Sequence, residues 1–447
     1  MAMGDKALSN QDLTTETTDV GSVSSWFDWF RWTRVPSPDP AMTVSCPMSQ
    51  SAPQLGDLAD VQIKEEIDCR SEELVTKCSA LDILDADEDE SWFSWLRWNR
   101  TSLRIIRSLE ERIFSYVRTS HKSFFVTLGT VVGVTDNKIW TIALNEDSEK
   151  VPLVLVHGFA SGSALWCLNL ETLAKDRPVY SFDVLGFGRS SRPIFSNDTE
   201  SVEKEFVESI EAWRRGLGLD KMILLGHSFG GYLATSYAIK YGSRVQHLIL
   251  ADPWGFPEKT ADDSERFSRL PLAVRALFKV ATYVNPLPLS SLRVAGPFGP
   301  KLIERYRQDI IERYSDFVGH DTRLITDYIY HCNARYPSGE MAFKHLVSGI
   351  GWARRPMLER MLKEFPDNIP VTFIYGGNSW ISYKAGQQLK DRRPQNTLLH
   401  IIEGAGHHVY AHDPQRFSEM VLEACEKSEA NRPSRESSPE KVTFGWS

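Results

Sequence analysis

The amino-acid sequence predicts an α/β protein with a mostly parallel sheet, and two observations support this class. Short β-branched and aromatic runs recur between about residues 124 and 402, and stretches with helical periodicity separate the later runs. Strands that alternate with helices form a parallel sheet that is covered on both faces. The first two runs are separated by only a short turn, which predicts that the sheet opens with an antiparallel pair.

We expect eight strands, each a short apolar run bounded by turn residues. They are Phe124–Val132, Lys138–Asn145, Leu153–Val156, Val179–Phe182, Met222–Leu225, His247–Ala251, Val371–Tyr375 and Thr397–Ile402. Helices are expected at Val202–Leu217 and Gly231–Tyr241. Residues 256–368 have a helical pattern and no clear strand, so they are predicted to form a helical cap between the sixth and seventh strands. Residues 121–255 and 369–425 would then be the two parts of one core.

The charge and the cysteines exclude several classes of protein. The 447 residues carry a formal net charge of −8, whereas a protein that binds nucleic acid needs a basic face. The six cysteines lie far apart and form no C-x-x-C pair, so we expect reduced thiols and neither a metal site nor a cofactor. No secretory signal pattern and no run of 18 apolar residues is present, which predicts a cytoplasmic protein without a spanning helix.

Both ends of the chain are predicted to be disordered. Residues 1–90 are rich in Ser, Thr, Asp and Glu, and residues 39–90 alone hold 14 acidic and 3 basic residues. Such a segment buries too little apolar surface to offset the loss of chain entropy. Residues 426–447 are polar and contain two prolines.

A tryptophan-rich decapeptide occurs twice, at Ser25–Arg34 and Ser91–Arg100, with seven of ten positions identical. Its tryptophans recur at every third residue, so each trio stays on one side of a helix. They are Trp26, Trp29, Trp32, Trp92, Trp95 and Trp98. Arginines and large apolar residues follow the second copy, so residues 91–120 are predicted to form a basic amphipathic helix on a membrane or lipid-droplet surface. The alternative is that these side chains pack on the protein's own core.

The segment Gly226-His227-Ser228-Phe229-Gly230 follows the apolar run Met222–Leu225 and precedes a helix that begins with small residues. This strand–turn–helix setting is what the nucleophile elbow of an α/β-hydrolase requires. The glycines are needed because the turn is tight and its serine adopts strained backbone angles. We therefore predict the α/β-hydrolase fold, with Ser228 as the nucleophile.

A second loop is expected to complete the oxyanion hole. The loop that starts at His157 follows a strand, and in this fold it supplies one N–H group to the oxyanion, while the residue after the nucleophile supplies the other. These would be the backbone amides of Phe159 and Phe229. His157 and Asp183 are expected to shape loops rather than to take part in catalysis.

The base is expected late in the chain, because the order on this fold is serine, acid, histidine. The segment Gly404-Ala405-Gly406-His407-His408 follows the last strand. His407 is the preferred base because its distance from the glycines matches the usual loop, and His408 would then point elsewhere.

The acid is harder to assign than the base. It usually lies just after the seventh strand, but that loop reads Gly376-Gly377-Asn378-Ser379-Trp380-Ile381-Ser382 and has no carboxylate. Asp252, at the end of the neighbouring sixth strand, is the leading candidate. The alternatives are Ser382 or Asn378 as a neutral orienting group, or an inactive triad.

Together with several cap sequences, these residues resemble one lipid-handling subfamily of the α/β-hydrolases. It contains the lysophospholipase that hydrolyses N-acyl phosphatidylethanolamines and the lipid-droplet coactivator of adipose triglyceride lipase. The resemblance covers residues 91–413 and includes Asp183–Pro193 (DVLGFGRSSRP), Ala251–Pro257 (ADPWGFP), Leu292–Gly299 (LRVAGPFG), Tyr328–Asn333 (YIYHCN), Pro337–Lys344 (PSGEMAFK) and Gly351–Leu358 (GWARRPML).

Three positions depart from the subfamily pattern. The coactivator branch has asparagine in place of the nucleophile, whereas this chain has Ser228. Ser382 stands where the subfamily has its triad aspartate. The H-x4-D acyltransferase motif is shifted by one residue, because it runs from His408 to Asp413 instead of starting at His407.

The resemblance implies a serine lipid hydrolase that acts on N-acyl phospholipids or lysophospholipids and takes part in lipid and triglyceride homeostasis. Lysophosphatidic acid acyltransferase activity is a further expectation. The alternative is a weakly catalytic or non-catalytic lipid-droplet protein that regulates a triglyceride lipase.

The expected partners are a phospholipid or lysophospholipid substrate, a membrane or lipid-droplet surface on which the protein is peripheral, and a triglyceride lipase or droplet coat protein. Nucleic acid is not expected. The cap would form the acyl-chain tunnel, with Arg293, Lys301, Arg305 and Arg307 as candidate phosphate contacts.

Overall fold

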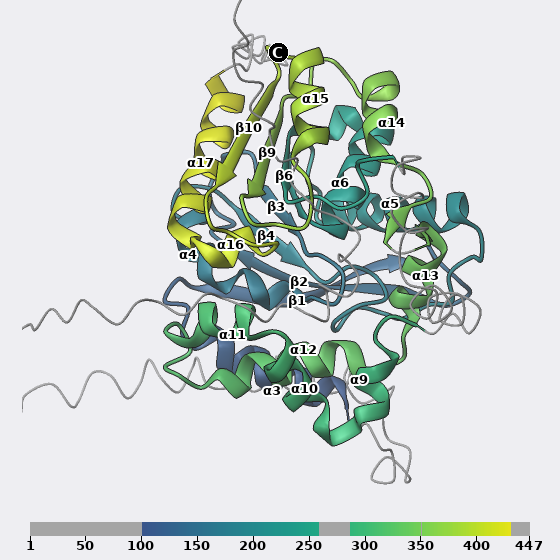
Figure 1. Ribbon diagram of the computed structural model, residues 1–447, viewed down its shortest axis with the longest axis vertical. Helices are drawn as coiled ribbons and strands as arrows, with labels where there is room; N and C mark the ends of the chain where they lie inside the picture. The colour runs from purple at the N-terminus through teal and green to yellow at the C-terminus, as the bar shows by residue number, and fades with distance from the viewer. Residues whose placement is uncertain (1–100, 259–286, 350, 431–447) are drawn as a thin grey trace, which may run out of the picture.

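An eight-stranded sheet runs through the centre of the computed structural model, which describes residues 101–258, 287–349 and 351–430 (Figure 1). The strand order is β1-β2-β4-β3-β5-β6-β9-β10. The strands are β1 (His121–Gly129), β2 (Asn137–Leu144), β3 (Leu153–Val156), β4 (Val179–Phe182), β5 (Met222–His227), β6 (Val245–Ala251), β9 (Val371–Gly376) and β10 (Thr397–Ile402). The predicted eight-stranded, mostly parallel sheet is therefore confirmed.

The sheet is antiparallel at one end and parallel through the rest. Strand β2 pairs antiparallel with both β1 and β4, and all the pairs from β4 to β10 are parallel. Every residue of β3, β5 and β9 is buried, as expected for parallel strands that are covered on both faces. Because the strands are parallel, their carboxyl ends meet at one edge, where loops can bring side chains together.

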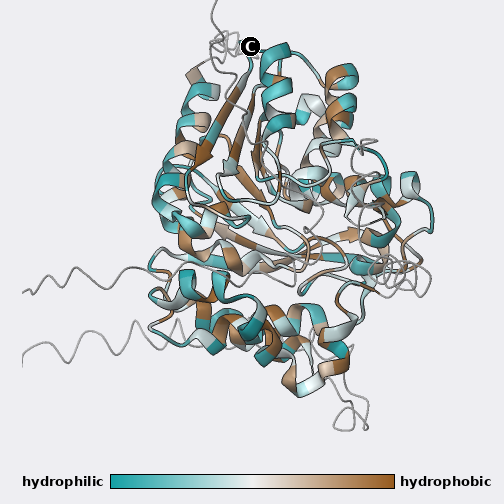
Figure 2. Ribbon diagram, viewed as in Figure 1, coloured by the Kyte–Doolittle hydropathy of each residue, from teal (hydrophilic) through white to brown (hydrophobic). Residues whose placement is uncertain are grey.

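Helices cover both faces of this sheet. One face is covered by α4 (Cys167–Leu173) and α17 (Pro414–Ala430), and the other by α5 (Thr199–Gly216), α6 (Phe229–Lys240) and α15 (Lys384–Arg392). Figure 2 shows the hydrophobic strands between the helices and the hydrophilic outer surface of α15. The short helices η2 (Ser163–Trp166), η3 (Gly242–Arg244) and α16 (Val409–His412) lie in the connecting loops.

The interval between β6 and β9 contains the cap, and the prediction that it has no strand was wrong. A two-stranded ribbon of β7 (Val347–Ser348) and β8 (Trp352–Ala353) lies within it. Strands of two residues are too short to produce a recognisable alternation of polar and apolar residues. The other elements in the described part of this interval are α9 (Ser290–Ala295), η4 (Gly296–Phe298), α10 (Gly299–Tyr306), α11 (Gln308–Ser315), α12 (Thr322–Ala334), α13 (Ser338–Leu346) and α14 (Met357–Glu364).

Helix α3 (Leu103–Phe114) packs against α12 of the cap, and the two lie side by side below the sheet in Figure 1. Its apolar face, which was predicted to contact a membrane, is buried: Ile106 and Ile113 are fully buried in the main core. The ion pair between Glu110 and Arg189, 2.9 Å apart and almost fully buried, also attaches α3 to the core. The alternative, packing on the protein's own body, therefore holds for this helix. The six repeat tryptophans lie outside the described residues.

The predicted start of the disordered C-terminal tail was also wrong by several residues. Helix α17 extends to Ala430, beyond the predicted boundary at 426. Its last turn is held by an ion pair of 2.8 Å between Glu429 and the buried Arg177, a tertiary contact that local composition does not reveal. Within the described ranges, no helix is long and apolar enough to cross a membrane.

Candidate active site

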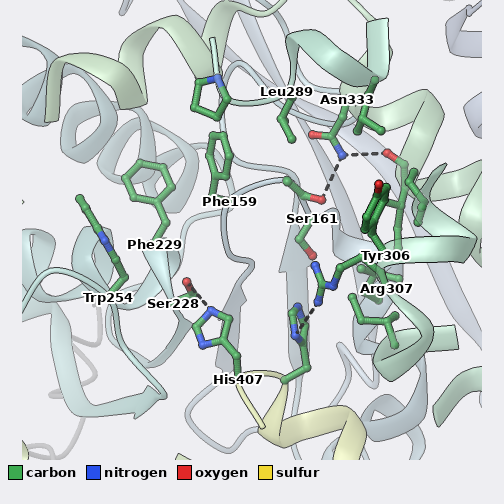
Figure 3. Close-up of a pocket in the computed structure, with 18 of the residues that line it drawn as sticks. Phe159, Ser161, Ser228, Phe229, Trp254, Leu289, Tyr306, Arg307, Asn333 and His407 are labelled. Carbon is green, nitrogen blue, oxygen red and sulfur yellow. Dashed lines mark hydrogen bonds between the residues drawn. The ribbon is translucent and has the colours of Figure 1, made fainter. Parts of the chain in front are cut away.

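Ser228 occupies the sharp turn between β5 and α6 (Figure 3). Its φ of 52° and ψ of −120° are unusual for a residue with a side chain, and a strained serine at this position is the mark of a nucleophile elbow. The turn is held by its backbone: Ser228 N donates to the Ala251 carbonyl at 3.1 Å, and the Ser228 carbonyl accepts from Trp254 N at 3.1 Å. The strain therefore persists because surrounding hydrogen bonds determine it.

The two glycines of the turn are required by close backbone approach. A Cβ atom at Gly226 would collide with the carbonyl of Gly230, and a Cβ atom at Gly230 would collide with the carbonyls of Val156 and His157. The predicted reason for glycine at both positions is thus present in the structure. Glycine at position 230 also allows the end of β3 and the loop that follows it to approach the nucleophile turn.

Ser228, His407 and Asp252 form a continuous hydrogen-bonded series. His407 Nε2 lies 2.9 Å from Ser228 Oγ, and His407 Nδ1 lies 2.6 Å from Asp252 Oδ2. Since the carboxylate accepts from Nδ1–H, Nε2 is left to accept the serine proton. The sequence prediction had placed these three residues on three separate loops, and the fold brings them together.

Asp252 follows β6 directly and is fully buried. Its φ of 44° is positive, a conformation that side chains with a Cβ atom seldom adopt. The carboxylate accepts a hydrogen bond of 3.2 Å from Gly376 N and another from Ser379 Oγ. Burial raises the pKa of Asp252, and these two hydrogen bonds oppose the rise. Ser379 was not predicted, although it lies in the loop where the acid was sought.

The two neutral alternatives to Asp252 do not contact the imidazole. Ser382 is exposed, and its Oγ accepts from Lys384 N at 3.3 Å. Asn378 is exposed as well, and its Nδ2 lies 3.5 Å from the Gly404 carbonyl. The loop after β9 therefore supports the acid through Ser379 and does not supply it.

The predicted oxyanion donors belong to two segments next to the nucleophile, the start of α6 and the loop after β3. Phe229 is the first residue of α6, and the first N–H groups of a helix have no partner inside it. Phe159 lies in the oxyanion loop, residues 157–162, which follows β3. At Gly158 a Cβ atom would be only 3.0 Å from the Ser228 Cβ, so glycine is needed for this loop to approach the serine.

His157 and Asp183 hold that loop, in line with the expected structural roles. His157 Nε2 accepts from Val184 N at 2.9 Å, and its Nδ1 lies 2.8 Å from the Gly158 carbonyl. Asp183 Oδ1 accepts from Ser163 N at 2.7 Å. Both side chains are buried and committed to backbone groups.

The charge state of His407 suits a proton acceptor. Burial, and after it the positive charge of Arg307, lower the pKa of His407 to about 3, while Asp309 opposes the shift. The imidazole is therefore neutral at pH 7. His408 was predicted to point elsewhere than His407, and its Nδ1 accepts from Arg307 Nη2 at 3.2 Å.

A mostly apolar cavity of about 370 Å³ opens beside Ser228. In Figure 3, Phe159, Phe229 and Trp254 lie on one side of the Ser228–His407 pair, and Tyr306, Arg307 and Asn333 lie on the other. Phe343 of α13 stacks on Phe159 with ring centroids 4.3 Å apart and extends the aromatic wall. The cavity thus has an aromatic side and a side with polar groups.

Of the four basic residues predicted to contact phosphate, Arg307 alone lines this cavity among the described residues. Lys301 and Arg305 are exposed. Arg293 forms an ion pair of 2.7 Å with Glu340 inside the cap. Sequence reasoning could not separate these residues, because a helical pattern alone does not say which face meets the cavity.

Comparisons with known proteins agree with this geometry. The model of a family described as the alpha/beta hydrolase fold matches residues 151–414. A (lyso)-N-acylphosphatidylethanolamine lipase of Bos taurus is 48% identical over 73% of this chain and 93% of the relative. The human 1-acylglycerol-3-phosphate O-acyltransferase ABHD5 is 47% identical over 77% of this chain and 97% of the relative.

Solved structures share the fold at low sequence identity. The naproxen esterase from Bacillus subtilis superimposes with a TM-score of 0.51 at 16% identity, over 72% of this chain and 96% of the esterase. This chain belongs to the α/β-hydrolase fold family, in the group that contains the (lyso)-N-acylphosphatidylethanolamine lipases and ABHD5.

Proposed function

We propose that this protein is a serine hydrolase that cleaves acyl esters of phospholipids or lysophospholipids. The observation that carries the proposal is the hydrogen-bonded series from Asp252 through His407 to Ser228, with distances of 2.6 and 2.9 Å. A serine, a neutral histidine and a buried carboxylate in this order are the parts that acyl transfer requires.

The proposed reaction proceeds through an acyl-serine. Ser228 Oγ attacks the ester carbonyl while His407 Nε2 takes the serine proton, and the amides of Phe159 and Phe229 stabilise the oxyanion. Collapse breaks the bond to the leaving alkoxide, which receives the proton from His407. A water molecule then attacks the acyl-serine with His407 again as the base, and release of the fatty acid restores Ser228.

The cavity supports a lipid substrate. Its aromatic wall of Phe159, Phe229, Trp254 and Phe343 suits an acyl chain. Arg307 is the one permanently charged cation among the described residues that line it, and it offers a partner for a headgroup phosphate. A relative named as an N-acylphosphatidylethanolamine lipase supports the same substrate class.

Lysophosphatidic acid is proposed as a second acyl acceptor, in place of water. The name of the ABHD5 relative, an acyltransferase that acts on 1-acylglycerol-3-phosphate, favours this activity. The shift of the H-x4-D motif to His408 and Asp413 weighs against it, since His408 is bonded to Arg307. The test is to incubate the protein with labelled lysophosphatidic acid and a phospholipid donor. Formation of labelled phosphatidic acid reports acyl transfer, and release of free fatty acid reports hydrolysis.

A regulatory, non-catalytic role is the competing function. It was favoured by Ser382, the serine at the usual position of the acid, and it loses that support because Asp252 lies at His407 Nδ1. A fluorophosphonate probe discriminates between the two. We expect the probe to label the wild-type protein and not Ser228→Ala. Absence of labelling in the wild type, or equal labelling of both, would overturn the hydrolase proposal.

We further propose that the two tryptophan repeats attach the protein peripherally to lipid droplets or intracellular membranes. Trp side chains prefer the interface between lipid and water. Replacement of the six repeat tryptophans by alanine is expected to release the protein from droplets in fractionated cells. Six alanine replacements of exposed residues elsewhere serve as the control, and unchanged droplet association of the tryptophan variant would rule out this anchor.

A further inference from the structure

The cap helix α12 contacts the oxyanion loop at two places. Asn333 Nδ2 donates to the Ala160 carbonyl at 3.0 Å. Just beyond, Ala164 N donates to Tyr328 Oη at 3.2 Å. A Cβ atom at Gly162 would collide with that hydroxyl, so the loop and the helix are in direct contact. Helix α12 therefore reaches the backbone next to the Phe159 amide.

The contact made by Asn333 falls on a strained residue. Ala160 has a φ of 58°, a left-handed conformation that is unfavourable for a residue with a Cβ atom. Such a conformation persists only where neighbouring groups determine it. The carbonyl of Ala160 is the group that Asn333 binds, so this hydrogen bond directly opposes relaxation of the loop.

Asn333 is itself fixed in place. It is almost fully buried, and its Nδ2 also donates to the Ile329 carbonyl at 2.7 Å. Its backbone carbonyl accepts from Arg293 Nη1 at 3.1 Å, and Arg293 pairs with Glu340 at 2.7 Å. These three side chains come from three separate cap sequences, LRVAGPFG, YIYHCN and PSGEMAFK. The cap sequences thus meet in one polar network that ends at the oxyanion loop.

We propose that Asn333 is a positioning residue for the oxyanion hole, and that the Arg293–Glu340 pair keeps Asn333 in place. Asn333 holds Ala160 in the left-handed conformation, and this fixes the backbone beside the Phe159 amide. The inference rests on the proposed serine-hydrolase function. Asn333 acts through the loop on the transition state and not on the bound substrate, because the oxyanion forms only in the transition state.

The test replaces the donor without changing the shape of the side chain. Asn333→Asp puts an oxygen in place of Nδ2 and faces it to two carbonyl groups. We expect kcat for p-nitrophenyl octanoate to fall by about 10- to 100-fold, because a small displacement of an oxyanion donor has effects of this size. KM is expected to change little. Affinity for an alkyl trifluoromethyl ketone, which forms an oxyanion on Ser228, should fall together with kcat, and affinity for the product octanoate should not.

A matched control lies on the same helix. Thr326 is buried, and its Oγ1 donates within α12 to the Arg323 carbonyl at 3.0 Å. Thr326→Val is expected to leave kcat and ketone affinity unchanged. Ala160→Gly adds a test of the role, because glycine adopts positive φ without cost. Added to Asn333→Asp, it should restore part of the lost kcat, which it would not do if Asn333 only stabilised the cap.

A readout independent of catalysis separates this inference from the proposed function. Hydrogen exchange of the amides of residues 159–161 should speed up in Asn333→Asp and not in Thr326→Val. If the hydrolase proposal fails, the wild type is inactive while this exchange difference remains. Unchanged exchange, or a normal kcat in an active Asn333→Asp protein, would overturn the positioning role. If Asn333→Asp does not fold, Arg293→Gln takes its place. We expect the same changes in kcat, ketone affinity and hydrogen exchange, each smaller than for Asn333→Asp.

Discussion

The turn after β6 and the loop after β9 end beside each other at the same edge of the sheet, yet they serve His407 differently. The turn supplies the buried carboxylate of Asp252, 2.6 Å from Nδ1. The loop supplies only hydrogen-bond donors, Gly376 N and Ser379 Oγ, to that carboxylate. The comparison teaches that a strand next to β9 can place a carboxylate at the imidazole while the loop after β9 holds that carboxylate by hydrogen bonds.

This arrangement is possible because of the strand order. Strand β6 lies between β5 and β9, so a side chain at its carboxyl end can reach both the nucleophile turn and the loop after β9. The positive φ of Asp252 directs its side chain there. The carboxylate at the end of β6 therefore lies on the Nδ1 side of the imidazole.

The largest expected effect comes from Asp252→Asn. The amide would donate to Nδ1 and favour the wrong imidazole tautomer, so kcat should fall by about 10³- to 10⁴-fold. Ester hydrolysis by the purified protein measures this, with the melting temperature as a control for folding. Retention of most of the activity would place the acid elsewhere and remove the basis of the comparison.

A smaller loss is expected for Ser379→Ala, which removes a hydrogen bond to the Asp252 carboxylate. Hydrogen bonds to charged groups contribute about 1.5–3 kcal/mol, and only part of that loss reaches the transition state. We expect kcat to fall about tenfold. Ser379→Thr keeps a hydroxyl and should keep most of the activity. Equal losses in both variants would mean that packing, not the hydrogen bond, matters here.

The pH profile tests the imidazole that both regions serve. Protonated His407 cannot accept the Ser228 proton, so kcat/KM falls as pH decreases through its pKa. Because burial and Arg307 lower that pKa, the acid limb should lie well below pH 6.5, the usual value for histidine.

Two variants give the sign of this effect. Arg307→Gln removes a charge that lowers the pKa of His407, so the acid limb should move to higher pH. Asp309→Asn removes one that raises it, so the limb should move to lower pH. Steady-state profiles of the three proteins, taken where each remains folded, measure the shifts. If the acid limb moved in the same direction in both variants, its assignment to His407 would be contradicted.

The smallest effect is expected at the position that the subfamily pattern marks for the acid. Ser382 is exposed and bonded to Lys384 N, so Ser382→Ala should change kcat by less than about twofold, as surface substitutions generally do. A large loss in the same ester assay would show that the loop after β9 still supplies an orienting group.

Sequence patterns alone predicted most of the framework. The strands of the parallel region were recognised because each is a short, continuously apolar run, and Ser228 because its turn has glycines where Cβ atoms would collide. Features set by distant contacts were missed or, for the burial of α3, given only as the alternative. Ser379, Asn333 and the burial of α3 against α12 all depend on elements that are close in space and far apart in the sequence.

The sequence by itself determined the fold, the nucleophile turn and the histidine loop, since each follows from local apolar runs and from glycines beside them. It left the acid open among Asp252, Ser382, Asn378 and none. Only the tertiary structure decided which of these groups lies at His407 Nδ1, because that depends on which strands are neighbours and on the backbone angle at Asp252. The order of residues along the chain does not give the distance between two loops in space. The hydrogen bond of 2.6 Å between Asp252 and His407 depends on that distance.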